Sequence, residues 1–133
     1  MYLIVPVDDR MGMAFNKRRQ SQDRVLREYL MTITKGRLLR MNHYSGELFG
    51  AAENIRVSED FLQQAGDEDF CYVENLDPRS CYPEVKALVL CRWNRAYPGD
   101  LHFSLDFSQW KLCYAEEFPG SSHEKITVEV YKP

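Results

Sequence analysis

The residues best suited to chemistry gather in a polar stretch that runs from Phe15 to Arg24. Three adjacent cations, Lys17-Arg18-Arg19, stand directly before Ser21 and Asp23. Cations beside the free amides of a helix start can hold a phosphate, a nucleotide or an RNA backbone. The alternative is a solvated, charged loop, because runs of charge are usually exposed and offset by acidic neighbours. Both interpretations stay open from the residues alone.

No metal or nucleophile motif accompanies this stretch. The three histidines lie far apart and lack the spacing of metal ligands: His43, His102 and His123. The sequence contains no serine elbow, P-loop or kinase motif. We therefore predict no metal site, and we expect His102 and His123 to be structural or solvated.

The cysteines contain no C-x-x-C pair, and a chain of this length does not need disulfides. We expect four free thiols, at Cys71, Cys81, Cys91 and Cys113. Three of them sit in apolar runs and are predicted to be buried and inert: Cys71, Cys91 and Cys113.

Length and composition indicate one globular domain over residues 1–133, since the 133 residues are 44% hydrophobic and 28% charged. The 17 basic and 20 acidic side chains give a net charge of −3, which argues against nucleic acid as the main partner. No apolar run approaches the roughly 20 residues of a membrane span. The N-terminus turns acidic too early for a signal peptide, so we predict a cytoplasmic protein with no membrane contact.

The first half of the chain predicts a strand, a helix and shorter elements. Tyr2–Val7 has the apolar pattern of a central strand, with a bulge or kink expected at Pro6. A helix is expected over residues 21–34, with Ser21 as its N-cap and Asp23 in its first turn. Further short elements are expected: a strand at 37–41, a helical turn at 44–49, a strand at 54–57 and a helix at 58–64.

The second half is richer in strands. Strands are predicted at 70–73 and 85–93, and a terminal antiparallel hairpin at 110–117 and 126–132. Together these elements predict an α/β fold with a mixed sheet.

Several segments resemble dihydrofolate reductases. The run from Ala87 to Phe103, with Trp110 and the ending Val128-Glu129-Val130-Tyr131, resembles the C-terminal third of that family. The opening strand up to Asp9-Arg10-Met11-Gly12 is also similar, and Met41–Gly50 resembles the family's Met-Gly-Arg-x-Thr turn. The resemblance implies a three-layer sandwich with a central mixed, mostly parallel sheet and a C-terminal antiparallel hairpin.

The resemblance also implies where a reductase site would lie. The family holds its pterin with a carboxylate near the start of the first helix. Counting from Gly12 places this carboxylate at Asp23, the candidate catalytic residue, whereas counting back from Thr34 places it at Leu26. In the cofactor turn, Ser45 matches the phosphate-binding threonine, while His43 replaces the arginine.

The family's phosphate-cradling Gly-Gly pair is replaced here by Glu74-Asn75. A glutamate adds bulk and negative charge against phosphates, so NADP is disfavoured and no cofactor is predicted. The chain is also shortened between about residues 50 and 70, where the family holds the adenosine half of NADPH. These departures predict a protein that is not a functional NADPH-dependent reductase.

Three functions remain open from the sequence. The first is a binding or regulatory protein for a small anionic or heterocyclic ligand, such as a nucleotide or pterin. Its ligand residues would be Arg18, Arg19, Arg24, His43, Tyr44, Ser45, Cys91 and Trp93, with Arg18, Arg19 and Arg24 facing the same cleft as Ser45 and Trp93 near the cleft mouth. The second is a divergent NADPH/pterin oxidoreductase with Asp23 as its acid.

The third function is an RNA-interacting protein that uses residues 17–24. Short bacterial proteins with a similar N-terminus are described as zinc-dependent, tRNA-maturing ribonucleases, but no residue pattern here supports that chemistry. A homodimer is also expected, because the shortening near residues 50–70 should expose a sheet edge.

Overall fold

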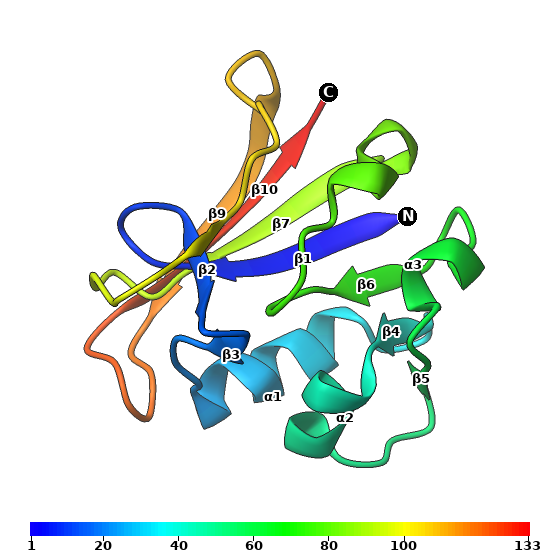
Figure 1. Ribbon diagram of the computed structural model, residues 1–133, viewed down its shortest axis with the longest axis horizontal. Helices are drawn as coiled ribbons and strands as arrows, with labels where there is room; N and C mark the ends of the chain where they lie inside the picture. Colours follow the sequence, from blue (N-terminus) through cyan, green and yellow to red (C-terminus); the bar gives the residue numbers. More distant parts are fainter.

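A seven-stranded sheet forms the middle of the protein, with the strand order β5-β4-β6-β1-β7-β10-β9 (Figure 1). The computed structural model describes all residues from 1 to 133. The pairings from β5 to β7 are parallel, and those of β10 with β7 and β9 are antiparallel, which confirms the predicted mixed sheet. The strands are β1 (Tyr2–Val7), β4 (Leu39–Met41), β5 (Ile55–Val57), β6 (Phe70–Tyr72), β7 (Ala87–Arg92), β9 (Lys111–Phe118) and β10 (Ile126–Lys132).

The strand β1 lies at the centre of the sheet, as its continuous apolar run predicts. It pairs with β6 on one side and β7 on the other. The bulge expected at Pro6 is absent, because the register with β7 continues through Pro6 to Val7. The pairing with β6 ends at Ile4, so Pro6 lies where no further donor is needed on that side.

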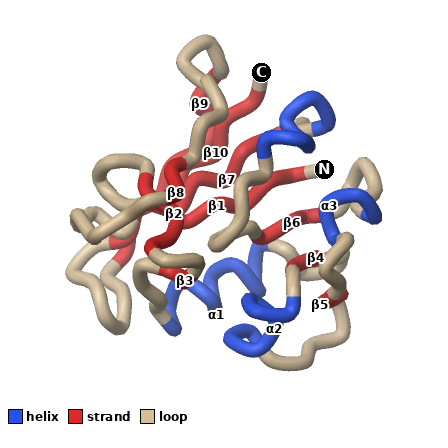
Figure 2. The backbone as a smooth tube through the Cα atoms, viewed as in Figure 1, coloured by secondary structure: helices blue, strands red, loops and turns tan.

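Two apolar cores lie on opposite faces of the sheet and give the protein three layers (Figure 2). On one face, Leu26 and Leu30 of α1 (Arg24–Ile33) pack with Ile4. The helix α2 (His43–Phe49) lies on the same side. On the other face, Leu3 packs with residues from β2 (Gly12–Phe15), from α3 (Phe61–Gln64) and from the 3-10 helix η1 (Arg79–Glu84). None of the helices has the length and apolar character needed to cross a membrane.

The helix α1 begins later than expected, at Arg24. Its N-cap is Asp23, whose Oδ1 accepts hydrogen bonds from the amides of Val25 and Leu26. The prediction of Ser21 as the cap was therefore wrong. The carboxylate two residues later caps the helix instead, and the Ser21 side chain makes another contact, with His123.

A second, three-stranded sheet was missed by the sequence analysis. It contains β2 (Gly12–Phe15), β3 (Arg18–Arg19) and β8 (Leu101–His102), in the order β3-β2-β8. The expected charged loop is thus a hairpin, whose turn residues Asn16 and Lys17 have φ angles of 52° and 64°. Two such residues allow the tight turn that joins twisted strands, although lysine rarely adopts this conformation. The two-residue strand was too short to produce a pattern.

Three of the four thiols are buried, and Cys113 is exposed. Burial raises the pKa of Cys71 to about 12 and that of Cys81 to about 11, and it also raises the pKa of Cys91. The expectation of a buried Cys113 was wrong, because β9 is an edge strand that is exposed from Lys111 to Glu117.

One thiol per chain is therefore expected to react with a thiol reagent in the folded protein. The exposed Cys113 should react within minutes, whereas the other three should react only after unfolding. Titration with Ellman's reagent, with and without denaturant, measures this. The Cys113→Ser variant should give no reaction in the folded state, and fast labelling of a second thiol would contradict the burial described here.

Candidate functional site

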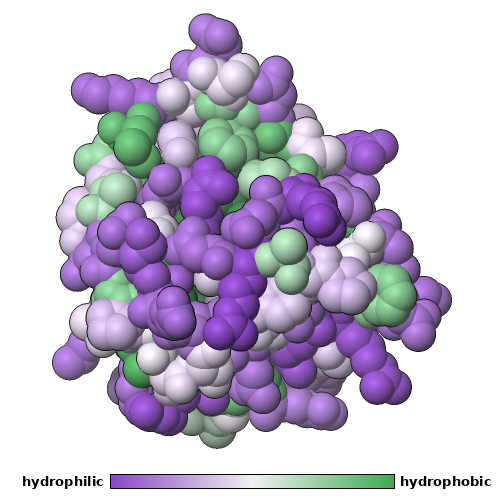
Figure 3. All heavy atoms as spheres, turned by 90° about the vertical axis from the view of Figure 1, so that its left-hand side faces the viewer, coloured by the Kyte–Doolittle hydropathy of each residue, from purple (hydrophilic) through white to green (hydrophobic).

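Polar side chains from four segments meet where the hairpin β2–β3, the loop after β7 and the loop between β9 and β10 approach the start of α1 (Figure 1). Figure 3 shows that this side of the molecule is largely hydrophilic, with small separate apolar patches. Three groups of contacts occupy it, centred on Asp23, on Asp8 and on Glu74.

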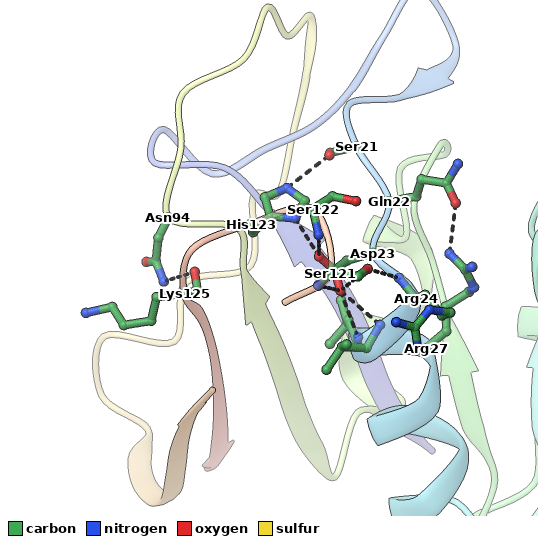
Figure 4. A network of polar contacts seen from close by, with 12 residues as sticks. Ser21, Gln22, Asp23, Arg24, Arg27, Asn94, Ser121, Ser122, His123 and Lys125 are labelled. Atoms are coloured by element: carbon green, nitrogen blue, oxygen red, sulfur yellow. Dashed lines mark hydrogen bonds and ion pairs between the residues drawn. The ribbon is translucent and has the colours of Figure 1, made fainter. Parts of the chain in front are cut away.

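Asp23 is the most heavily bonded carboxylate of the site (Figure 4). Its exposed fraction is only 2%. Besides capping α1, it accepts hydrogen bonds from the amides of Ser121 and Ser122 at 3.0 and 2.8 Å and from the Ser121 hydroxyl at 3.2 Å. Its Oδ2 lies 2.9 Å from Nδ1 of His123. Gly120 lets this loop come so close, because a Cβ at that position would collide with the carboxylate.

These contacts hold Asp23 in its ionised form. Burial by itself raises the pKa of the carboxyl, but the hydrogen bonds from His123, Ser121, Ser122 and Leu26 outweigh it, so the pKa lies well below its usual range. Both carboxylate oxygens are occupied by the protein itself. Asp23 therefore joins the start of α1 to the 121–123 loop.

A loss of stability in acid is expected from this carboxylate. A carboxyl whose pKa is lowered by folding contributes stability above its ordinary pKa of about 4, and this contribution is lost as the pH falls below that value. Thermal unfolding between pH 7 and pH 3 measures the loss. The Asp23→Asn variant should show a smaller acid-induced fall in Tm than the wild type, and an identical fall would contradict the role assigned to Asp23.

His123 links Asp23 to two hydroxyl groups. Its Nε2 lies 3.0 Å from the Ser21 Oγ and 3.0 Å from the Tyr97 hydroxyl. The indole of Trp93 stacks on the imidazole with 4.6 Å between ring centroids. Both rings are buried, so of the two expectations for His123, structural or solvated, the solvated one was wrong. The expectation that Trp93 lies at a cleft mouth was wrong, because His123 covers it.

The second group of contacts is centred on Asp8, at the end of β1. Its carboxylate accepts hydrogen bonds from the amides of Gly12 and Tyr97 at 2.7 and 3.0 Å and from the Gln20 side chain at 3.2 Å. Burial raises the pKa of Asp8, but the hydrogen bonds outweigh this and lower it. Asp8 thereby fixes the positions of Gln20 and Tyr97.

The third group is centred on Glu74, directly after β6. This carboxylate is 1% exposed and forms two hydrogen bonds of 3.0 Å with the guanidinium of Arg19. The Ser45 hydroxyl donates to Oε2 of Glu74 at 2.7 Å. The ring of Tyr44 packs against Arg19, whose Cζ lies 4.1 Å from the ring centroid. Arg19, Tyr44, Ser45 and Glu74 therefore form one closed network.

The start of α2 is also filled by the protein's own acceptors. The Asn42 side chain accepts the amide of Ser45 at 3.0 Å. Glu59 accepts the amide of His43 at 2.9 Å and also contacts its ring at 2.7 Å. These side chains occupy the amides of His43 and Ser45, so neither amide is free to bind a phosphate.

The structure brings together only some of the residues predicted to form one cleft. Arg24 does not face Ser45 as expected, because it pairs with Glu28 on the exposed surface of α1. His43 points to Glu59 in an exposed ion pair. Cys91 lies inside the core beneath α1. Arg19, Tyr44 and Ser45 do lie together.

A cavity of about 320 Å³ lies beside these groups. Its lining includes Arg18 and Tyr97, and the Arg18 side chain is exposed and forms no ion pair with the protein. The Oε1 atom of Gln20 is buried here without a hydrogen-bond partner. The lining residues are Phe15, Asn16, Arg18, Arg19, Gln20, Tyr97 and Pro98. No group of three or more histidine, cysteine, aspartate or glutamate side chains is placed to hold a metal ion.

Comparison with known proteins tests the fold. No family model and no curated protein matches the sequence. Among solved structures, dihydrofolate reductase from Enterococcus faecalis, complexed with NADP(H) and RAB-propyl, matches with a TM-score of 0.69 and 12% identity, over 98% of this chain and 94% of that chain. The fold is that of a dihydrofolate reductase. At this identity the likeness concerns the reductase-like fold alone, and it agrees with the order of motifs in the sequence.

Sequence analysis missed four residues of the site: Ser21 as a partner of His123, His123 itself, Tyr97 as a hydrogen-bonding group and Glu74 as an ion-pair partner. Their partners lie 26 to 102 residues away in the chain, so no local spacing could reveal them. The one available signal was Glu74 in place of a glycine.

Proposed function

We propose that this protein binds a small anionic ligand in the cavity beside Arg18 and does not act as an NADPH-dependent reductase. The observation that carries the proposal is the closed network of Arg19, Glu74 and Ser45. It supplies a carboxylate of the protein to Ser45, which the resemblance assigns to a cofactor phosphate, and to Arg19, which the charged stretch predicts as a ligand residue.

The residues do not fit NADP. In the reductase-like pattern, the positions of Glu74 and Asn75 belong to two glycines that let the backbone approach the phosphates. Here the Glu74 carboxylate already neutralises Arg19 and accepts the Ser45 hydroxyl. A phosphate at Ser45 would meet this buried negative charge at close range. The replacement therefore opposes cofactor binding both by bulk and by charge.

The candidate acid for pterin chemistry also does not fit. Both oxygens of Asp23 accept hydrogen bonds from the protein, and the pKa of the carboxyl is lowered rather than raised. A general acid needs a proton near neutral pH and an oxygen that can reach the substrate. The alternative position, Leu26, is a core side chain without a carboxylate. These observations weigh against the divergent-oxidoreductase alternative.

The cavity itself supports a small ligand with negative charge. Arg18 offers a guanidinium without a counter-ion, and Tyr97 offers an aromatic surface. A volume of about 320 Å³ is at the lower end of ligand sites, which favours a compact ligand over a dinucleotide. Because Arg19 is already neutralised by Glu74, the run 17–19 offers less charge to RNA than its sequence suggests.

Thermal unfolding in the presence of single ligands tests this proposal. The panel contains inorganic phosphate, nucleoside monophosphates, a pterin carboxylate, methotrexate and NADPH. A ligand at 100 times its Kd stabilises by about 2.7 kcal/mol, which is a shift of several degrees for a domain of this size.

Arg18→Gln should abolish the shift caused by a compact anion, whereas the matched variant Lys17→Gln should keep it. Both variants remove one positive charge from adjacent exposed positions. An equal loss in both variants, or no stabilisation by any compact anion, would contradict the proposed site. The predicted homodimer stays a prediction, and sedimentation at high concentration tests it.

A further inference from the structure

We infer that Ser21 is a nucleophile, activated by His123 and Asp23, that accepts acyl groups from small esters. The inference goes beyond ligand binding, because a ligand can bind beside Arg18 without reacting. It stands on the positions of three side chains from two segments of the chain: Ser21 and Asp23 before α1, and His123 in the loop between β9 and β10 (Figure 4).

The three groups form a continuous line of hydrogen-bonding atoms. Asp23 Oδ2 lies 2.9 Å from His123 Nδ1, and His123 Nε2 lies 3.0 Å from Ser21 Oγ. An acid, an imidazole and a hydroxyl at these distances are the arrangement by which serine hydrolases of unrelated folds activate their nucleophile. The arrangement is recognised by geometry and roles, so its absence from any sequence motif does not count against it.

The hydrogen-bond partners determine where the protons lie. Asp23 is ionised and accepts from every neighbour, so Nδ1 of His123 must donate to it. In the neutral imidazole, Nε2 carries a lone pair and can accept a proton from a hydroxyl. The Tyr97 hydroxyl donates to Ser21 Oγ at 3.3 Å, which leaves the Ser21 hydroxyl to donate to Nε2. His123 is thus oriented as a general base toward Ser21.

The three side chains differ in burial, and the nucleophile, which must be reachable by a substrate, is the most exposed of them. Asp23 and His123 are 2% and 4% exposed, and the stacked indole of Trp93 fixes the imidazole from one side. Ser21 is only partly buried and is the end of the line that faces outward. Tyr97, which contacts both Ser21 and His123, also lines the Arg18 cavity. Ser21 does not line the cavity itself, but it follows the lining residue Gln20 and contacts the lining residue Tyr97.

The proposed reaction begins when the Ser21 Oγ forms a bond with the acyl carbon of the ester. The hydroxyl proton passes to Nε2 of His123, and Asp23 stabilises the resulting imidazolium. The bond between the acyl carbon and the alcohol oxygen breaks, and the alcohol leaves with the proton from Nε2. Water then attacks the acyl-serine, gives one proton to Nε2, and releases the carboxylic acid while Oγ regains that proton. Arg18 favours substrates whose acyl part carries a negative charge.

Labelling with a fluorophosphonate probe tests the inference on the intact chain. The probe forms a bond with an activated serine oxygen and loses fluoride, and mass spectrometry of peptides locates the label. We expect one label per chain at Ser21. The Ser21→Ala variant should react about 100-fold more slowly, in line with the loss of a base-activated group.

Ser122→Ala is the matched control, because Ser122 neighbours His123 but its hydroxyl forms no hydrogen bond within the protein. This control should label at the wild-type rate. Wild-type protein that stays unlabelled, or that labels equally in the Ser21→Ala variant, overturns the inference. If Ser21→Ala fails to fold, Ser21→Cys replaces it, and its new thiol should react with iodoacetamide faster than the exposed Cys113. A slower reaction than that of Cys113 also overturns the inference.

A second readout separates activation from a structural role and from the proposed function. A burst of p-nitrophenol from neutral p-nitrophenyl acetate should be lost in His123→Gln, which removes the base, and it should survive in Lys17→Gln, whose side chain is exposed and lies outside the proposed site. A burst that persists in His123→Gln contradicts activation by His123. Stabilisation by anions without any serine labelling overturns the inference while leaving the proposed ligand site intact, whereas labelling without anion binding contradicts the proposed site alone.

Discussion

The Asp23→Asn variant is expected to lose about 3 kcal/mol of its free energy of unfolding, which lowers the Tm by roughly 10 °C. The asparagine side chain has one accepting oxygen, and an NH2 group that cannot accept replaces the other oxygen. Donors of the 121–123 loop, such as the Ser122 amide and His123 Nδ1, would therefore lose their acceptor. Buried donors left unpaired cost more than the hydrogen bonds themselves contribute. Urea denaturation followed by circular dichroism measures the difference.

The matched control for this change is Asp9→Asn. Asp9 is exposed, and its side chain accepts no hydrogen bond from the protein. Its replacement should change the stability by less than about 0.5 kcal/mol. If Asp23→Asn were as mild as this control, the 121–123 loop would not depend on the carboxylate, and the description of the site would be wrong.

The second large effect is expected at Glu74. The Glu74→Gln variant keeps the shape of the side chain but leaves Arg19 without its counter-ion, at a cost of about 2 kcal/mol, since Arg19 is partly exposed. Phosphate or sulfate should restore part of this stability, because Arg19 and Ser45 would then be free to hold an anion. Thermal unfolding with and without 50 to 100 equivalents of anion measures both effects.

Glu28→Gln is the control for the ion pair. Glu28 pairs with Arg24 on the surface, with both side chains more than 60% exposed, so its loss should cost less than about 0.5 kcal/mol. It should also gain no additional stability from phosphate. Equal behaviour of the two variants would contradict the view that Glu74 neutralises an anion site.

Much of the fold could be predicted from the sequence. The apolar runs of β1 and β7 have patterns that a sheet buries, and these strands and the terminal hairpin β9–β10 appear where they were expected. The helix α1 was also found, although its cap was placed two residues early. The β2–β3–β8 sheet was not predicted, because β3 and β8, the two partners of β2, have only two residues each and form no pattern.

The candidate site was less predictable than the fold. Ser21 and His123 are 102 residues apart, and Arg19 and Glu74 are 55 apart, so only the folded sheet brings them together. The sequence did indicate that Glu74 is an unsuitable neighbour for phosphates. It could not indicate that this carboxylate would be paired with the very arginine expected to bind the ligand.

A titration of the wild-type protein with NADPH, followed by the fluorescence of the bound dinucleotide, tests the central claim most directly. The claim is that Glu74 fills the position of a cofactor phosphate, and it predicts no saturable binding of NADPH under conditions in which a compact anion raises the Tm. Saturable NADPH binding, accompanied by a decrease in absorbance at 340 nm when dihydrofolate is added, would contradict it and would indicate that the protein is a functional reductase.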